Sequence, residues 1–168
     1  MRARGGMISG VLAILVILII IAAAIRPSWA FSVTRTSDAT PAQIWAWYAN
    51  TNDVPKWDPL MKGVVLHGNF AAGSWGENIP VAGPTLPFTL TSVTPTQYYT
   101  EVMQLPLASV ESTHILSPMG GKTRIEHGMT MSGSMAWAYE LLLRKRIEAG
   151  MNQAIDNLAA NANHGLPR

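Results

Sequence analysis

The chain of 168 residues contains no cysteine, which excludes disulfides, thiolate metal sites and a cysteine nucleophile. It also has no internal repeat, no low-complexity tract and no glycine-rich phosphate cradle. Of its twelve Lys and Arg residues, Arg2, Arg4 and Arg26 flank one apolar segment, which leaves nine against ten Asp and Glu. A domain so close to neutrality lacks the basic surface that binds nucleic acid. We therefore expect no nucleic-acid partner, and no motif for a cofactor is present.

The apolar segment runs from Ile8 to Ile25 without a charge. As a helix it is roughly 27 Å long, enough to cross the hydrocarbon core of a bilayer. Residues 1–28 are therefore predicted to be a single-pass membrane anchor. The positive N-terminus stays in the cytoplasm, so the domain lies on the outer, periplasmic or extracellular, side. Small residues at Ser28 and Ala30 leave a cleaved signal peptide and a secreted domain as the alternative.

Turn signals and hydrophobic periods divide residues 29–162 into one strand, two short helices, six further strands and a long helix. Thr40, Pro41 and Gln43 form a capping box before the first helix, residues 41–50. A helical turn or loop follows at residues 54–59. The strands are predicted at residues 30–37, 63–67, 74–79, 87–93, 97–105, 110–118 and 123–133. For residues 97–105 both faces are equally apolar, so the inward face stays open.

The long helix is predicted from Met135 to about Ala162, with Ser134 as its N-cap and residues 163–168 as a tail. Its expected buried stripe follows three-to-four spacing: Met135, Tyr139, Leu142, Leu143, Ile147, Met151, Ile155 and Leu158. Gly150 within this helix indicates a close approach or room beneath it. The charge run 144–146 is typical of a solvated face, and contact with anionic headgroups is the alternative. An antiparallel sheet with one apolar face needs a cover, so we expect an α+β fold with the sheet curled around this helix.

The hairpin from Val110 to Gly133 carries the candidate chemistry. With a loop at residues 119–122, alternation places His114 and His127 on the apolar faces of the two strands. Pro118 then pairs with Thr123, and the two histidines lie directly opposite each other, with Cβ atoms roughly 5 Å apart. An inward pair of histidines can act as general acid and base on a carbonyl compound. The alternative is a pair of buried histidines satisfied by hydrogen bonds.

Several residues resemble the helix-grip (SRPBCC) superfamily, which includes polyketide cyclases and dehydrases, the birch pollen allergen and START lipid-transfer domains. The resemblance covers residue 31 to about residue 162. It rests on Lys56-Trp57-Asp58-Pro59, on Gly73 and Gly76, and on His114, Leu116, Pro118, Gly121, Thr123-Arg124, His127 and Gly133. The N-terminal apolar segment is a departure from the soluble members.

The resemblance implies a deep cavity between the sheet and the long helix. Trp57, Trp75, His114, Ile125, His127 and Met129 would line it. No carboxylate is expected on the face of the histidines, so a metal site is not expected. The leading hypothesis is a membrane-tethered binding protein for a hydrophobic small molecule or lipid. The alternative is a polyketide cyclase or dehydratase-type enzyme that uses His114 and His127 as acid and base.

Overall fold

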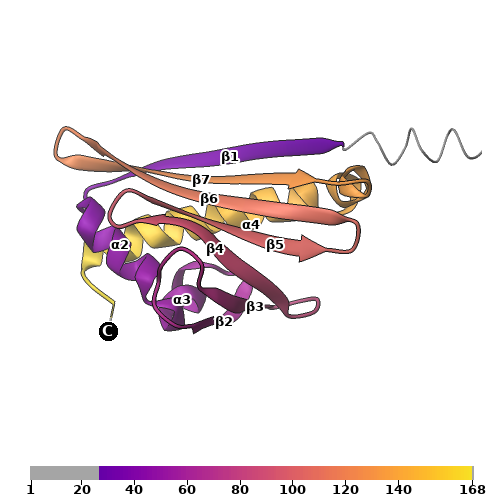
Figure 1. The fold of residues 1–168 in the computed structure, drawn as a ribbon. Coiled ribbons are helices and arrows are strands. Elements are labelled where there is room, and N and C mark those ends of the chain that lie inside the picture. The colour runs from indigo at the N-terminus through magenta and orange to yellow at the C-terminus, as the bar shows by residue number, and fades with distance from the viewer. Residues whose placement is uncertain (1–26, 168) are drawn as a thin grey trace, which may run out of the picture.

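A computed structural model describes residues 27–167 of the chain. Its elements follow the predicted order of one strand, short helices, six strands and a long helix (Figure 1). They are β1 (Ser28–Ser37), α2 (Pro41–Ala49), the 3-10 turn η1 (Thr51–Asp53), α3 (Val54–Trp57), β2 (Met61–His67), β3 (Trp75–Pro80), β4 (Leu86–Thr94), β5 (Tyr98–Leu105), β6 (Ala108–Met119), β7 (Lys122–Ser132) and α4 (Ala136–His164).

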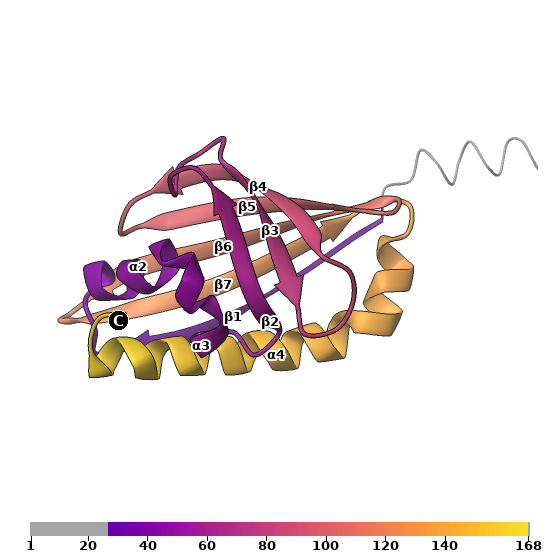
Figure 2. The same ribbon diagram turned by 90° about the horizontal axis from the view of Figure 1, so that it is seen from below.

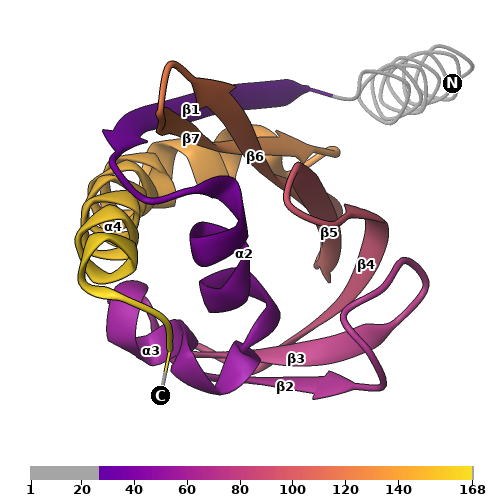
Figure 3. The same cartoon turned by 90° about the vertical axis from the view of Figure 1, so that its left-hand side faces the viewer.

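The strands form one antiparallel sheet in the order β1-β7-β6-β5-β4-β3-β2. Viewed from the end, the sheet curls around α2, and α4 lies on the open side between β1 and α3 (Figure 3). Figure 2 shows α4 running along most of the length of the molecule. This arrangement confirms the predicted α+β helix-grip fold for the part of the chain that the structure describes.

The capping box before α2 is present as predicted. The Thr40 hydroxyl accepts a hydrogen bond from the Gln43 backbone N–H at 3.3 Å, and the Gln43 side chain accepts one from the Thr40 N–H at 2.8 Å. Both bonds satisfy donors that a helix start leaves unpaired. The helix thereby begins at Pro41 and turns Ile44 and Tyr48 into the core.

The hairpin of β6 and β7 has the predicted register. Gly120 and Gly121 form its turn with φ of 57° and 84°, a conformation that glycine adopts without steric cost. His114 is consequently paired with His127. The alternation of side chains then places the apolar face of both strands on the concave side of the sheet.

Three predictions for the long helix are corrected. Met135, with no side-chain cap bond, is the N-cap in place of Ser134, and the helix extends to His164. Ile155 and Leu158 are fully buried, but Met135 and Leu142 are exposed. The first turns of α4 stand at an angle to the rest of the helix (Figure 2). They turn Ala136 toward β1, β6 and β7, which leaves Met135 and Leu142 on the outer side.

Within residues 27–167 no helix is both long and apolar enough to cross a bilayer. The run from Ile8 to Ile25 lies outside the described residues, so the membrane anchor stays a prediction.

Candidate functional site

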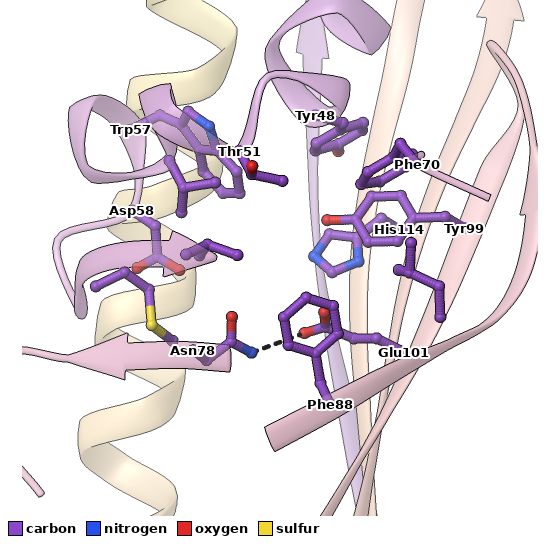
Figure 4. A pocket seen from close by; sticks show the side chains of 14 residues that line it. Tyr48, Thr51, Trp57, Asp58, Phe70, Asn78, Phe88, Tyr99, Glu101 and His114 are labelled. Atoms are coloured by element: carbon purple, nitrogen blue, oxygen red, sulfur yellow. Dashed lines mark hydrogen bonds between the residues drawn. The ribbon is translucent and has the colours of Figure 1, made fainter. Parts of the chain in front are cut away.

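A cavity of about 60 Å³ lies between the short helices and the concave face of the sheet (Figure 4). Most of its wall is aromatic or aliphatic, with a few polar side chains among them. The lining residues are Tyr48, Thr51, Val54, Trp57, Asp58, Met61, Val64, Phe70, Asn78, Phe88, Leu90, Tyr99, Glu101 and His114. None belongs to α4, which corrects the expectation of a cavity between the sheet and that helix.

The C-terminal half of α4 instead holds the short helix that forms one wall. Asn157 donates a side-chain hydrogen bond to the Trp57 carbonyl at 3.2 Å, and Asn161 donates one to the Lys56 carbonyl at 3.2 Å. α4 therefore positions Trp57 without contributing to the lining.

Of the six residues predicted to line the cavity, Trp57 and His114 do so. Ile125, His127 and Met129 are buried on the predicted face but belong to the core behind the lining. The prediction for Trp75 is wrong, because this side chain is 52% exposed and stacks on His67 with ring centroids 4.0 Å apart. Its neighbours Gly76 and Asn78 take the inward and buried positions of β3, so alternation turns Trp75 outward.

Sequence reasoning missed the two carboxyl groups of the cavity, Asp58 and Glu101. In the register of β5, Tyr99 is paired with His114, so the two side chains share a face. Glu101 is two residues after Tyr99 and therefore lies on the same face. Figure 4 shows Asp58 and Asn78 on one wall, facing Tyr99, His114 and Glu101 on the other. The expectation of no carboxylate on the face of the histidines is therefore wrong, because Glu101 lies on that face. The sequence showed only that Tyr99 and Glu101, two residues apart, share one face of this strand.

Burial raises the pKa of both carboxyls. Removal from water raises the pKa of Glu101 to about 7, the hydrogen bond from Asn78 lowers it, and the charge of Asp58 raises it. Burial raises the pKa of Asp58 to about 6, against the lowering effect of the Leu60 backbone N–H at 2.8 Å. Neither carboxyl forms an ion pair with a Lys or Arg of residues 27–167. Protonated and ionised forms are thus both accessible near neutral pH.

The two histidines differ in position: His114 lines the cavity, and His127 lies behind the lining. Nε2 of His127 lies 2.8 Å from the Tyr48 hydroxyl, so this nitrogen is satisfied and the ring is held behind the cavity. His114 stacks on Tyr99, with centroids 4.2 Å apart and planes 4° from parallel. Its Nδ1 has no hydrogen-bond partner among residues 27–167. Burial, together with the neighbouring His127, holds the pKa of His114 well below its usual value, so the ring is neutral.

Within the described residues, no three His, Asp or Glu side chains are grouped to hold a metal ion.

Residues 28–163 match the family described as polyketide cyclase / dehydrase and lipid transport. The chain belongs to this family. No curated protein sequence matches the chain. The residues that match the family, 28–163, include all the elements of the fold except the last residue of α4.

Solved structures share the fold of this family member at low sequence identity. Norcoclaurine synthase from Thalictrum flavum, in complex with dopamine and hydroxybenzaldehyde, has 14% identity and a TM-score of 0.68, over 89% of this chain and 94% of that one. Ara h 8.0201 has 13% identity and a TM-score of 0.66, over 81% and 98%. The di-domain ARO/CYC StfQ of the steffimycin biosynthetic pathway has 11% identity and a TM-score of 0.69, over 82% of this chain and 51% of that one.

Proposed function

We propose that this chain is a membrane-tethered binding protein for a hydrophobic small molecule or lipid. The observation that carries the proposal is the cavity under α2 and α3, whose aromatic and aliphatic walls surround a small set of polar groups. Binding sites for small molecules have this composition, in which the apolar wall supplies affinity and a few polar groups fix orientation. Nε1 of Trp57 and Nδ1 of His114 have no hydrogen-bond partner among residues 27–167 and are available for that second task.

The size of the cavity sets a condition on binding. A volume of about 60 Å³ holds a few water molecules. A drug-sized ligand occupies several hundred cubic ångströms. A larger ligand is therefore admitted only when the elements that line the cavity move apart.

Native mass spectrometry of the full chain, extracted gently from its host membrane, tests the proposal. A stoichiometric apolar adduct is expected. Val64→Phe fills the cavity and is expected to lose the adduct, whereas Val65→Phe is the matched control, because the Val65 side chain is exposed on the other face of β2. Retention of the adduct by Val64→Phe, or no adduct at all after soaking in lipid extract, would contradict a binding role for this cavity.

The second candidate function is a cyclase or dehydratase-type enzyme. The specific observation in its favour is that Glu101, with a pKa of about 7, shares the cavity with His114 and the Tyr99 hydroxyl. A carboxyl group that is half protonated at neutral pH suits general acid–base catalysis on a carbonyl compound. His127 does not line the cavity, and its Nε2 lies against the Tyr48 hydroxyl, so it would act on a substrate only through Tyr48.

Exchange of the α-hydrogens of simple aromatic ketones in D2O, followed by NMR, tests this second function without knowledge of the natural substrate. An enzyme of this type accelerates the exchange, and Glu101→Gln abolishes the acceleration. Glu111→Gln is the control, because Glu111 is exposed on the outer face of β6. Equal exchange with both variants, or none above background with the native chain, counts against catalysis.

The tether itself is tested by intact-mass measurement and alkaline extraction of membranes. A full-length species that resists extraction supports a single-pass anchor with the domain on the outer side of the cell membrane. A species that lacks the first 30 residues and is released into solution indicates a cleaved signal peptide and a secreted protein.

A further inference from the structure

The first turns of α4 carry the most exposed large apolar side chains of the helix. Trp137 is 57% exposed, Leu141 80% and Leu142 75%. Trp137 and Leu141 are four residues apart and therefore neighbours on one side of the helix. Leu142 follows about 100° further around the helix and widens the exposed apolar surface. We call these three residues the α4 patch. Leu107 lies close by, since its carbonyl accepts the Met135 backbone N–H at 3.2 Å, and it is also exposed.

The same outward side of α4 changes character after the patch. The exposed positions of α4 beyond Arg146 are all small or polar: Ala149, Gln153, Asp156, Ala160, Asn163 and His164. Exposed Trp and Leu side chains in the first two turns are unfavourable if this part of the helix contacts only water. A cluster of exposed apolar side chains at one end marks an interaction surface.

The basic run next to the patch divides into two parts. Arg144 forms ion pairs with Glu140 and with Glu148, the latter at 2.8 Å, so its charge is compensated. Lys145 and Arg146 are exposed and form no ion pair with residues 27–167. Lys145 lies one helical turn beyond Leu141, and Arg146 one turn beyond Leu142. Apolar side chains therefore adjoin two uncompensated positive charges.

The chain enters the domain at this same place. The Pro27 carbonyl accepts the Gly133 N–H at 3.1 Å, and the Trp29 indole donates to the Ala136 carbonyl at 2.9 Å. The start of β1 is thus bonded to the start of α4, and Figure 1 shows these two ends at the same end of the molecule. Only Arg26 separates Pro27 from the apolar run that ends at Ile25, and two residues of chain reach at most about 7 Å.

We infer that the α4 patch docks on an anionic lipid bilayer, with Trp137, Leu141 and Leu142 in the interfacial layer and Lys145 and Arg146 at the headgroups. Trp is favoured at this depth because its ring is apolar and its indole N–H is polar. Basic residues beside an apolar helix face favour anionic lipid. This inference rests on the tether proposed above, which brings the patch to the bilayer.

Docking in this way fixes the orientation of the domain. In Figure 1, α2 lies at the opposite end of the sheet from the start of β1. The end of the molecule that carries α2 is therefore held away from the bilayer. Its cavity then exchanges ligand with the aqueous side.

Fluorescence of the full chain in vesicles of phosphatidylcholine with one third phosphatidylglycerol tests the docking. Brominated lipid is expected to quench part of the tryptophan emission, and Trp137→Phe is expected to remove most of that quenching. Trp75→Phe is the matched control, because Trp75 is similarly exposed but lies on β3, and it should leave the quenching unchanged. Leu141→Glu with Leu142→Glu should also abolish it, by placing acidic groups against anionic lipid.

The other outcomes identify other occupants or a failed tether. Quenching that is unaffected by Trp137→Phe overturns the inference. A blue-shifted Trp137 emission that brominated lipid does not quench also overturns it. If that blue shift is lost in nanodiscs holding a single copy of the chain, a second copy covers the patch, and if it persists there, the patch is covered by the N-terminal segment. A chain that fails to float with the vesicles contradicts the tether, whereas flotation without Trp137 quenching contradicts only the docking.

Discussion

At the scale of single residues, the back wall of the cavity depends on the hydrogen bond between Tyr48 and His127. Both side chains are almost completely buried, and the two atoms are 2.8 Å apart. Such a bond contributes little net free energy while it is made. Its loss leaves a buried polar atom without a partner, which is costly.

Tyr48→Phe is therefore expected to lower the free energy of unfolding by about 1–3 kcal/mol. Urea denaturation followed by circular dichroism measures this change. Ser92→Ala removes a hydroxyl that bonds Tyr98 at the surface, and is expected to change stability by less than about 0.5 kcal/mol. A Tyr48→Phe variant as stable as Ser92→Ala would show that His127 finds another partner.

Glu101 gives the stability of the fold a dependence on pH. Its pKa is raised from 4.5 to about 7 in the folded state, so the folded protein binds more protons than the unfolded chain between these values. Stability therefore falls as pH rises from about 4.5 to 7. His114 and His127 act in the opposite direction, because their pKa values are lowered and stability rises with pH up to about 6.5.

Comparison of the native chain with Glu101→Gln isolates the carboxyl group from the histidines. Near pH 4 the two side chains are similar in shape and charge, so equal stability is expected. Above pH 7 the variant should be more stable by about 2–3 kcal/mol, since it buries no charge. Urea midpoints between pH 4 and 8 measure the difference, and a difference independent of pH would contradict a buried ionisable group.

At the scale of elements, α4 approaches the chain after α3 closely at one glycine. A Cβ added to Gly150 would lie 2.5–2.8 Å from three atoms of the Leu60 side chain. This contact confirms the close approach that the glycine indicated in the sequence. Real Cβ atoms do not come so near, so either the helix or Leu60 would have to move.

Gly150→Ala is accordingly expected to destabilise the protein by roughly 1 kcal/mol, because steric strain of about 1–3 kcal/mol exceeds the gain of about 1 kcal/mol in helix propensity. In a Leu60→Ala background the strain is absent, and the same change should stabilise by about 1 kcal/mol. A double-mutant cycle in urea measures the change of sign. The same sign in both backgrounds would mean that Leu60 is not the obstacle.

At the scale of the whole molecule, the length of strand pairing differs along the sheet. β6 and β7 are paired from Met119 and Lys122 back to Ser109 and Ser132, and both are flanked by further strands. β3 and β4 are paired only over the Trp75–Asn78 segment of β3, and β2 is one of the two edges of the sheet. Short pairing and an edge position lower the cost of local opening.

Native-state hydrogen exchange is therefore expected to divide the sheet. Amides of β6 and β7 should exchange only through global unfolding, and those of β2 and β3 through a local opening several kcal/mol lower in free energy. The opening of β2 and β3 is also the motion that enlarges the cavity, because Val64 and Asn78 line it. Exchange at one uniform free energy across the sheet would contradict this division.

The sequence by itself determined those features that depend on neighbouring residues and simple periods. The capping box of Thr40 and Gln43, the two-glycine turn and the pairing of His114 with His127 are of this kind, because hydrogen-bonded turns and alternation act over a few residues. The order of the elements, and with it the helix-grip fold, follows from the same local signals.

Only the tertiary structure decided which faces enclose the cavity. In β5 the two faces are equally apolar, so the position of Glu101 depended on pairing with β6. Trp75 faces outward because the inner side of β3 has room only for Gly76 and Asn78. Leu142 is exposed because the first turns of α4 face the sheet with Ala136, so that Leu142 lies on the outer side of the helix. In each case the type of side chain does not predict its environment: Glu101 is ionisable but lines the cavity, and Trp75 and Leu142 are apolar but exposed. Strand pairing and the packing of α4 on the sheet determine the environment instead.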